Sequence, residues 1–421
     1  MGRLIRHLRS RWLALLPLFA VIGPGIVTAT VDNDAGGITT YSLCGAQFGT
    51  KLLWTLIPTT LALVVAQEMC SRMGVVTRKG LADLIRENFG VRTTFLLLLG
   101  LLIANLGTTC AEFSGIAASC ELFHIPKYVS VPLAALGVWW LVLRGTYRGV
   151  EKVFLLATVF YGAYIVSGLL GHLPWRHLVV ETVRPQIEPS YAYVAMFVGV
   201  VGTTIAPWMQ FYLQAAVVDK GLTAKDYRYS RLDVMLGYAL TMTVAFFVIA
   251  TCSKFLHEHQ PPIRIETAKE AALALEPVAR GYSKSLFGFG LFVSSLFGAT
   301  VLPLSTTFCI CEGIGWERGV DRNFREAPEF YTLYTAMIVI GALVAVWPHA
   351  PLVPIMYWSQ VLNGAMLPPL LILMLLLINR PEIMGGWVNS LAFNAVAWLT
   401  SIVLILLSVI LLIGMAFPWA S

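Results

Sequence analysis

The stretch VDNDAGG, residues 31–37, places two carboxylates within the first long apolar run of the chain. Insertion scales put the cost of an acid at the centre of a membrane helix at roughly 2.5 to 3.5 kcal/mol, so its presence there indicates function. Adjacent glycines weaken a helix, and we therefore predict a break at residues 34–37. Unwound backbone frees carbonyl oxygens, and the C-terminal end of a half-helix carries partial negative charge. The stretch thus predicts a cation site, with Asp34 as its carboxylate and Asp32 as a second candidate.

The composition is that of a polytopic membrane protein. Of the 421 residues, 57% are hydrophobic and only 12% are charged, whereas soluble domains carry about 25% charged residues. The net charge of +6 is not gathered into a basic stripe with interleaved aromatic residues, so we expect a lipid bilayer and not nucleic acid as the partner. The seven cysteines lie mostly within apolar runs, which indicates neither a disulfide framework nor a zinc site.

Eleven apolar runs are long enough to cross the hydrocarbon, which takes roughly 20 residues of helix. The runs are 14–46, 52–71, 94–121, 129–146, 152–171, 192–218, 232–256, 285–313, 329–347, 352–379 and 391–417. Most of the 29 Lys and Arg residues lie where a cytoplasmic N-terminus would keep them inside, which predicts that orientation and a C-terminus outside. No loop is long enough to fold alone, so we expect residues 1–421 to form a single domain in the plasma membrane.

The segment TTIAPWMQ, residues 203–210, predicts a second break, in the sixth span. Pro207 removes a helical hydrogen bond and disfavours helix at Ala206. Breaks in spans 1 and 6 are what five helices followed by a repeat of five produce, and such paired interruptions mark the substrate site of inverted-repeat transporters. We therefore predict an all-α, LeuT-like 5+5 inverted repeat, over roughly 14–171 and 192–379, with an extra helix at 391–417.

Five segments, in order and at matching spacing, carry a resemblance to a known family. They are GPGIVTATVDNDAGGITTYSLCGAQFGTKLLW (23–54), SRMGVVT (71–77), CAEFSGIA (110–117), YRGVEKVF (147–154) and GTTIAPWMQFYLQAA (202–216). Together they resemble the NRAMP family of divalent-metal transporters over most of the chain. The resemblance implies a transporter, not an enzyme, and implies no cofactor besides the transported ion.

Departures from the family pattern fall on its metal ligands. The family has Asp-Pro-Gly-Asn in the first helix, and residues 34–37 read Asp-Ala-Gly-Gly, so the acid is kept and the amide is lost. The family has Met-Pro-His in the sixth helix, and residues 206–208 read Ala-Pro-Trp, so the thioether is lost. An Asp of the family's proton route is Thr109 here, although Glu112 remains. This pattern is similar to that of the NRAMP-related magnesium transporters.

The chemistry of the lost ligands also favours magnesium. A thioether selects softer ions, whereas Mg²⁺ takes oxygen ligands and keeps several of its waters. Loss of two direct ligands leaves a roomier, oxygen-lined pocket that suits a partly hydrated ion. We predict Mg²⁺ as the cargo, with Mn²⁺ as a further candidate. The predicted site consists of Asp34, Gly37, the Thr203 carbonyl, Ala206, Gln360 and Asn363, with Thr39 and Thr40 as additional candidates.

The seven histidines lie in loops or at span ends, which leaves none in the bundle core to carry protons. We therefore expect alternating access that moves Mg²⁺ into the cell, driven by the membrane potential and without protons. We also expect the protein to be a monomer. The first alternative is a proton-coupled Mn²⁺ or Fe²⁺ transporter. A sodium-coupled amino-acid symporter is a second, although Asp34 would repel the substrate carboxylate. An intramembrane prenyl-transfer enzyme is a third, but it would need a second aspartate-rich motif.

Overall fold

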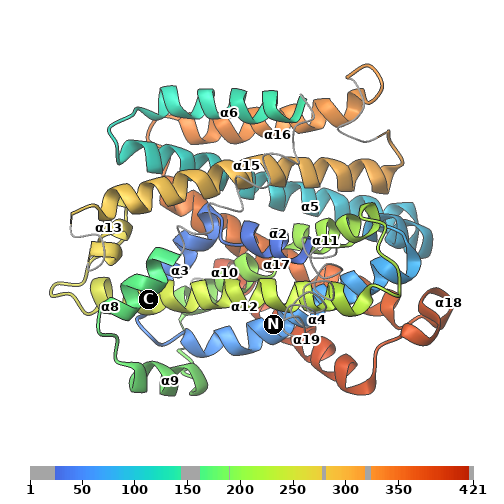
Figure 1. Cartoon of the computed structure of the whole chain (residues 1–421), viewed down its shortest axis with the longest axis horizontal. Coiled ribbons are helices and arrows are strands. Elements are labelled where there is room, and N and C mark those ends of the chain that lie inside the picture. Colours follow the sequence, from blue (N-terminus) through green and yellow to red (C-terminus); the bar gives the residue numbers. More distant parts are fainter. Residues whose placement is uncertain (1–23, 144–161, 189, 277–280, 318–323, 417–421) are drawn as a thin grey trace, which may run out of the picture.

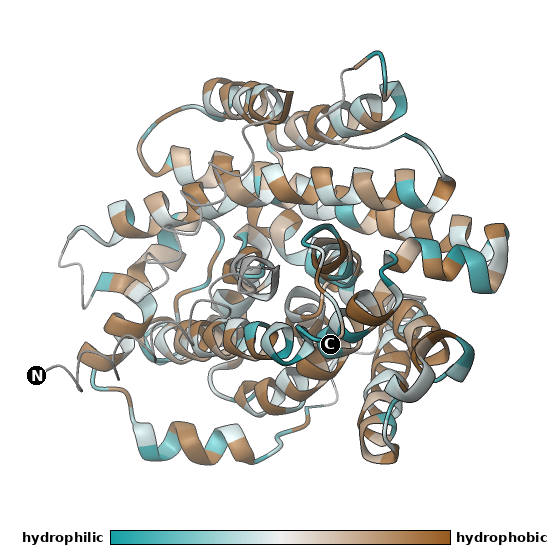
Figure 2. Cartoon of the chain, turned by 45° about the vertical axis from the view of Figure 1, so that its right-hand side comes forward, coloured by the Kyte–Doolittle hydropathy of each residue, from teal (hydrophilic) through white to brown (hydrophobic). Residues whose placement is uncertain are grey.

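The computed structural model describes residues 24–143, 162–188, 190–276, 281–317 and 324–416. All regular elements within these ranges are helices. Figure 2 shows hydrophobic residues along most of the helix lengths and hydrophilic residues mainly in loops and at helix ends. Among the described residues, eight helical stretches are long and apolar enough to cross a membrane. Lys127–Leu143 is a shorter apolar helix of 17 residues.

The helices follow the predicted spans closely. The main elements are α2 (Pro24–Val31), α3 (Ala35–Phe48), η1 (Leu53–Thr55), α4 (Leu56–Thr77), α5 (Leu81–Glu121), α6 (Lys127–Leu143), α8 (Gly162–Leu170), α9 (Trp175–Val183), α10 (Tyr191–Thr204), α11 (Pro207–Asp219), α12 (Tyr227–Cys252), η3 (Ser253–His257), α13 (Ala268–Ala272), η4 (Leu273–Leu275), α15 (Ser283–Ile314), α16 (Pro328–Val346), α17 (Leu352–Ile378), α18 (Pro381–Met384), η5 (Gly385–Trp387) and α19 (Leu391–Ala416).

A few boundaries differ from the prediction. The helix expected at 94–121 begins at Leu81, and its φ of 81° at Gly90 marks a kink between two helical segments. The predicted starts at residues 14 and 152 lie outside the described residues, as does the predicted end at 417. The predicted span end at 146 and the whole segment YRGVEKVF, 147–154, also lie there.

The broken helices lie in the middle of the molecule. In Figure 1, α6 and α16 form an outer layer, and α15 and α5 lie beneath it. The short helices α2, α3, α10 and α11 follow, together with α17, and α12 and α4 lie on their other side. Direct packing of α3 and α10 on α17, and of α2 and α3 on α12, agrees with this order. Both breaks are therefore enclosed by long helices.

The first break lies slightly earlier in the chain than predicted. Helix α2 ends at Val31, residues 32–34 form the turn, and α3 begins at Ala35. The predicted break at 34–37 is thus wrong in position, because Gly36 and Gly37 are helical. They serve close packing instead: a Cβ at Gly36 would lie 1.8 Å from Nε2 of Gln360. A Cβ at Gly37 would lie 2.6 Å from the carbonyl oxygen of Asp32.

The second break lies where proline predicts it. Helix α10 ends at Thr204, and Pro207 occupies the first turn of α11, where its missing N–H costs no helical hydrogen bond. Ala206 between them is extended, with φ −63° and ψ 140°.

Helix α2 packs closely against α12 and is hydrogen-bonded to it at two positions. The Gly25 N–H donates to Oδ2 of Asp233 at 2.6 Å, and the Thr241 hydroxyl donates to the carbonyl of Ala29 at 2.7 Å. A Cβ at Gly237 would lie 2.7 Å from the carbonyl oxygen of Gly25, so the two backbones approach as closely as glycine allows.

Candidate metal site

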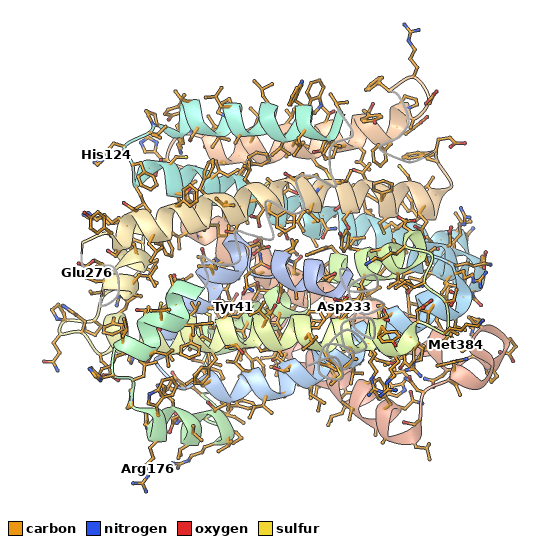
Figure 3. All side chains as sticks on the ribbon, in the orientation of Figure 1. Tyr41, His124, Arg176, Asp233, Glu276 and Met384 are labelled. Carbon is orange, nitrogen blue, oxygen red and sulfur yellow. The ribbon has the colours of Figure 1, made fainter. Side chains whose placement is uncertain are left out.

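The two breaks lie against each other. The Tyr41 and Thr204 hydroxyl oxygens are 2.8 Å apart and hydrogen-bonded, which joins α3 to the end of α10. The Thr203 hydroxyl lies 3.1 Å from the position of a Cβ on Gly37. Figure 3 shows Tyr41 and Asp233 inside the bundle, whereas His124, Arg176 and Glu276 lie at its periphery. The structure therefore brings the first and sixth spans together at one buried place.

Asp34 occupies this place as the N-cap of α3. It is 5% exposed, and its Oδ1 accepts a 2.6 Å hydrogen bond from the Gly37 N–H. The positive end of the α3 dipole stabilises a carboxylate at this position. The prediction that Asp34 lies at a break is confirmed in outline, but the acid lies at the N-terminal end of a half-helix. The negative C-terminal end belongs to α2, which ends three residues earlier, at Val31.

Glu112 is the second acid beside the break. The Ala35 N–H donates to its Oε2 at 3.5 Å, so Glu112 lies beside the first residue of α3, directly after Asp34. Its Oε1 has no hydrogen-bond partner in the described part of the chain. The sequence indicates Glu112 only as a remnant of a proton route, and the structure places it next to the first break.

Two amide side chains of α17 lie near the first break. Nε2 of Gln360 packs against Gly36, and the buried Asn363 donates to Oε1 of Gln360 at 3.0 Å. Asn363 also donates to the Thr108 hydroxyl at 3.0 Å, while its Oδ1 meets no donor among residues 24–143, 162–188, 190–276, 281–317 and 324–416. Gln360 thus lies directly at the first break, and Asn363 lies one hydrogen bond away from it.

The sixth span contributes Thr203 and Ala206, both 3% exposed. Thr203 lies in the last turn of α10, where carbonyl oxygens lack helical partners. Its hydroxyl has no partner within the described ranges. Ala206 lies in the second break and offers only backbone atoms.

A sulfur atom also lies near the site. The Thr39 hydroxyl on α3 contacts Sδ of Met356 at 3.4 Å, and Met356 precedes Gln360 by one turn of α17. The predicted loss of a direct thioether ligand at Ala206 stays a prediction, and Met356 brings a sulfur atom from a distant part of the chain against α3.

Comparison with known proteins places the chain in a defined group. A family model described as "Natural resistance-associated macrophage protein-like", Nramp, matches residues 25–414. The chain is 25% identical over 413 residues to the divalent metal cation transporter MntH of Burkholderia ambifaria, covering 94% of this chain and 89% of that protein. It is 26% identical over 403 residues to MntH of Acidiphilium cryptum, covering 93% and 89%.

Solved structures show the same fold. A crystal structure of the Eremococcus coleocola manganese transporter, bound to an aromatic bis-isothiourea compound, matches with a TM-score of 0.79 at 22% identity, covering 96% of this chain and 89% of that one. A nucleobase-cation-symport-1 family transporter in a closed conformation matches with a TM-score of 0.54 at 14% identity, covering 95% and 94%. The predicted fold class is confirmed.

Proposed function

The chain belongs to the Nramp family, and on this basis we propose that it is a divalent metal cation transporter that works by alternating access. One observation carries the proposal: Asp34, Thr203 and Gln360, far apart in the sequence, lie together at two helix breaks inside the bundle. Irregular backbone at membrane depth occurs where it lines a site or a cavity. All three side chains are at most 5% exposed, so the site is closed in this conformation.

We propose Mg²⁺ as the cargo on the chemistry of these side chains. Asp34 and Thr203 supply carboxylate and hydroxyl oxygen, and Ala206 supplies no sulfur. The Gln360 amide turns its Nε2 toward Gly36 and accepts a hydrogen bond from Asn363 at its Oε1, so it would offer oxygen to an ion only after the amide rotates. Oxygen ligands suit Mg²⁺, which retains several waters and needs few direct protein contacts. An inside-negative potential supplies about 2.3 kcal/mol per charge per 100 mV, and roughly twice that for a divalent ion, which supports entry without protons.

Proton-coupled Mn²⁺ transport is the second candidate, and specific observations favour it. The matched relatives are named divalent metal cation transporter MntH and manganese transporter. The thioether of Met356 contacts Thr39 on α3, and Glu112, an acid able to carry a proton, accepts a hydrogen bond from the Ala35 N–H beside Asp34.

Flux into proteoliposomes separates the two candidates. Our proposal predicts Mg²⁺ uptake that grows with an inside-negative potential and leaves the lumenal pH dye unchanged, and Mn²⁺ uptake that excess Mg²⁺ suppresses. Mn²⁺ uptake that is indifferent to excess Mg²⁺ and acidifies the lumen would support the second candidate instead. Absence of flux for both ions would reject divalent cation transport.

A further inference from the structure

We propose a second cation subsite at Asp32, on the α2 side of the first break, built from its carboxylate and the phenol oxygen of Tyr238. It would hold the same divalent cation as Asp34 does, at a different stage of its passage, and in this respect it rests on the proposed function.

Asp32 is a buried acid whose oxygens are uncommitted. It is 2% exposed, and neither Oδ1 nor Oδ2 has a hydrogen-bond partner among the residues described. Buried polar groups are nearly always hydrogen-bonded. A buried carboxylate without a partner destabilises the fold strongly, because its charge is uncompensated. Asp34 differs, since its Oδ1 accepts a hydrogen bond from the Gly37 N–H. Of the two acids in the stretch, Asp32 is the one with both carboxylate oxygens unpaired among the described residues.

The backbone around Asp32 favours positive charge. Asp32 directly follows Val31, the last residue of α2, and its N–H makes a helical hydrogen bond to Thr28 at 3.1 Å. The C-terminal end of a helix carries roughly half a negative charge. Asp34 instead lies at the positively charged N-terminal end of a helix, as the N-cap of α3. The physical argument that a half-helix C-terminus plus a carboxylate makes a cation site therefore applies to Asp32.

Tyr238 on α12 completes the arrangement. Its side chain is fully buried, and its hydroxyl is without a partner in the ranges that the structure covers. Its neighbours on α12, Gly237 and Thr241, both contact α2: Gly237 packs against the carbonyl oxygen of Gly25, and Thr241 donates to that of Ala29. The nearby Tyr41 differs, because its hydroxyl is bonded to Thr204. Beside Asp32, Oδ1 of Asn33 is a fourth buried oxygen that the described residues leave unpaired.

This donor set is hard and carries one negative charge. Carboxylate, phenol and carbonyl oxygens suit Mg²⁺ or Mn²⁺. Because the two acids are only two residues apart, cations on both at once would repel each other strongly at low dielectric. We therefore infer that a single cation occupies the two subsites in turn.

Binding of ⁵⁴Mn²⁺ to purified full-length protein, by equilibrium dialysis, tests the subsite. Asp34→Asn should weaken binding but leave a residual component, and adding Asp32→Asn should remove that component. The matched control is Asp34→Asn with Asp233→Asn, since Asp233 is an equally buried acid that already accepts a hydrogen bond from Gly25. This control should retain the residual binding. Loss of the residual component in the control as well, or its survival without Asp32, would overturn the proposal.

Single variants in proteoliposomes provide a second test. Asp32→Asn should lower Mn²⁺ and Mg²⁺ uptake at least tenfold, and Tyr238→Phe should lower it several-fold. Tyr164→Phe removes another buried hydroxyl, on α8, and it should leave uptake unchanged. Wild-type rates in Asp32→Asn would refute the subsite while leaving the transport function intact. A wild type that binds Mn²⁺ through Asp32 but carries neither ion would refute the transport function alone.

Discussion

At the scale of the residue, Asp34 combines two roles that one substitution can separate. Asp34→Ala would remove both the α3 cap and the charge, and losing a cap costs about 1 kcal/mol. Asn caps a helix as well as Asp does, so Asp34→Asn should leave the thermal midpoint of unfolding nearly unchanged. A ligand bond to a charged group is worth roughly 1.5 to 3 kcal/mol, so Mg²⁺ affinity should fall about tenfold to a hundredfold. Unchanged affinity, measured by calorimetry, would contradict the assignment.

Gly36 offers a second test at this scale. In Gly36→Ala the new methyl group would meet Nε2 of Gln360 at 1.8 Å. That atom ends a flexible side chain, so it can swing away, and we expect a stability change of no more than about 1 kcal/mol. The amide would leave the break, and cation affinity should fall several-fold. Gly137→Ala, on α6 with no described atom within 4 Å of the new methyl group, is the control and should leave affinity unchanged.

The sequence identifies Asp34 as a site residue, but it does not identify which residues surround Asp34. Asp34 stands out because a carboxylate in an apolar run has few structural uses. The contact between Thr39 and Met356 joins residues 317 apart in the chain, and no periodicity or spacing in a single sequence specifies such a pairing. Asp32 was recognised only as a second candidate. Its importance emerges from the helix polarity at the break, which depends on where α2 ends.

At the scale of the element, proline gives a sharper signal than glycine. Pro207 forbids the helical hydrogen bond, so the second break lies where it is predicted. Gly36 and Gly37 only permit irregular backbone, and here they are helical and allow Gln360 and Asp32 to pack closely. The first break was therefore misplaced by a few residues although its existence was predicted correctly.

The contact between α2 and α12 should control access to the site. In Gly237→Ala the methyl group would lie 2.7 Å from the Gly25 carbonyl oxygen and 2.9 Å from Cβ of Ala29. Neither atom can rotate away, so α2 must separate from α12. We expect a cysteine introduced at Ala29, now 2% exposed, to react with a maleimide several-fold faster in this background.

Gly100→Ala is the matched control for that experiment. Its methyl group would meet only the flexible end of Met366, at 3.4 Å. The reactivity at position 29 should therefore stay at its wild-type value. Equal labelling rates in the Gly237→Ala and Gly100→Ala backgrounds would show that the close α2 contact does not hold α2 in place.

At the scale of the whole molecule, the sequence predicts the fold because a membrane span has a strong compositional signal. The described helices match the predicted runs from 52–71 to 391–417 with few differences, and the fold class agrees with solved structures. The domain limits and the monomeric state stay predictions. So does the orientation, which depends on charge bias alone.

Labelling of loops tests the orientation. All seven native cysteines are buried, so an impermeant maleimide should give little background on intact cells. A cysteine at the exposed His124 should react from outside, whereas one at the exposed Gly221 should react only after the cells are permeabilised. The reverse pattern would place the N-terminus outside.

The central claim is that a divalent cation binds where the two broken helices meet. Anomalous diffraction from crystals grown with Mn²⁺ tests it most directly, because the ion is located without reference to transport. We predict one strong peak within ligand distance of an acid at the first break, Asp34 or Asp32, that weakens when Mg²⁺ is added in excess. A peak remote from both breaks would contradict the account.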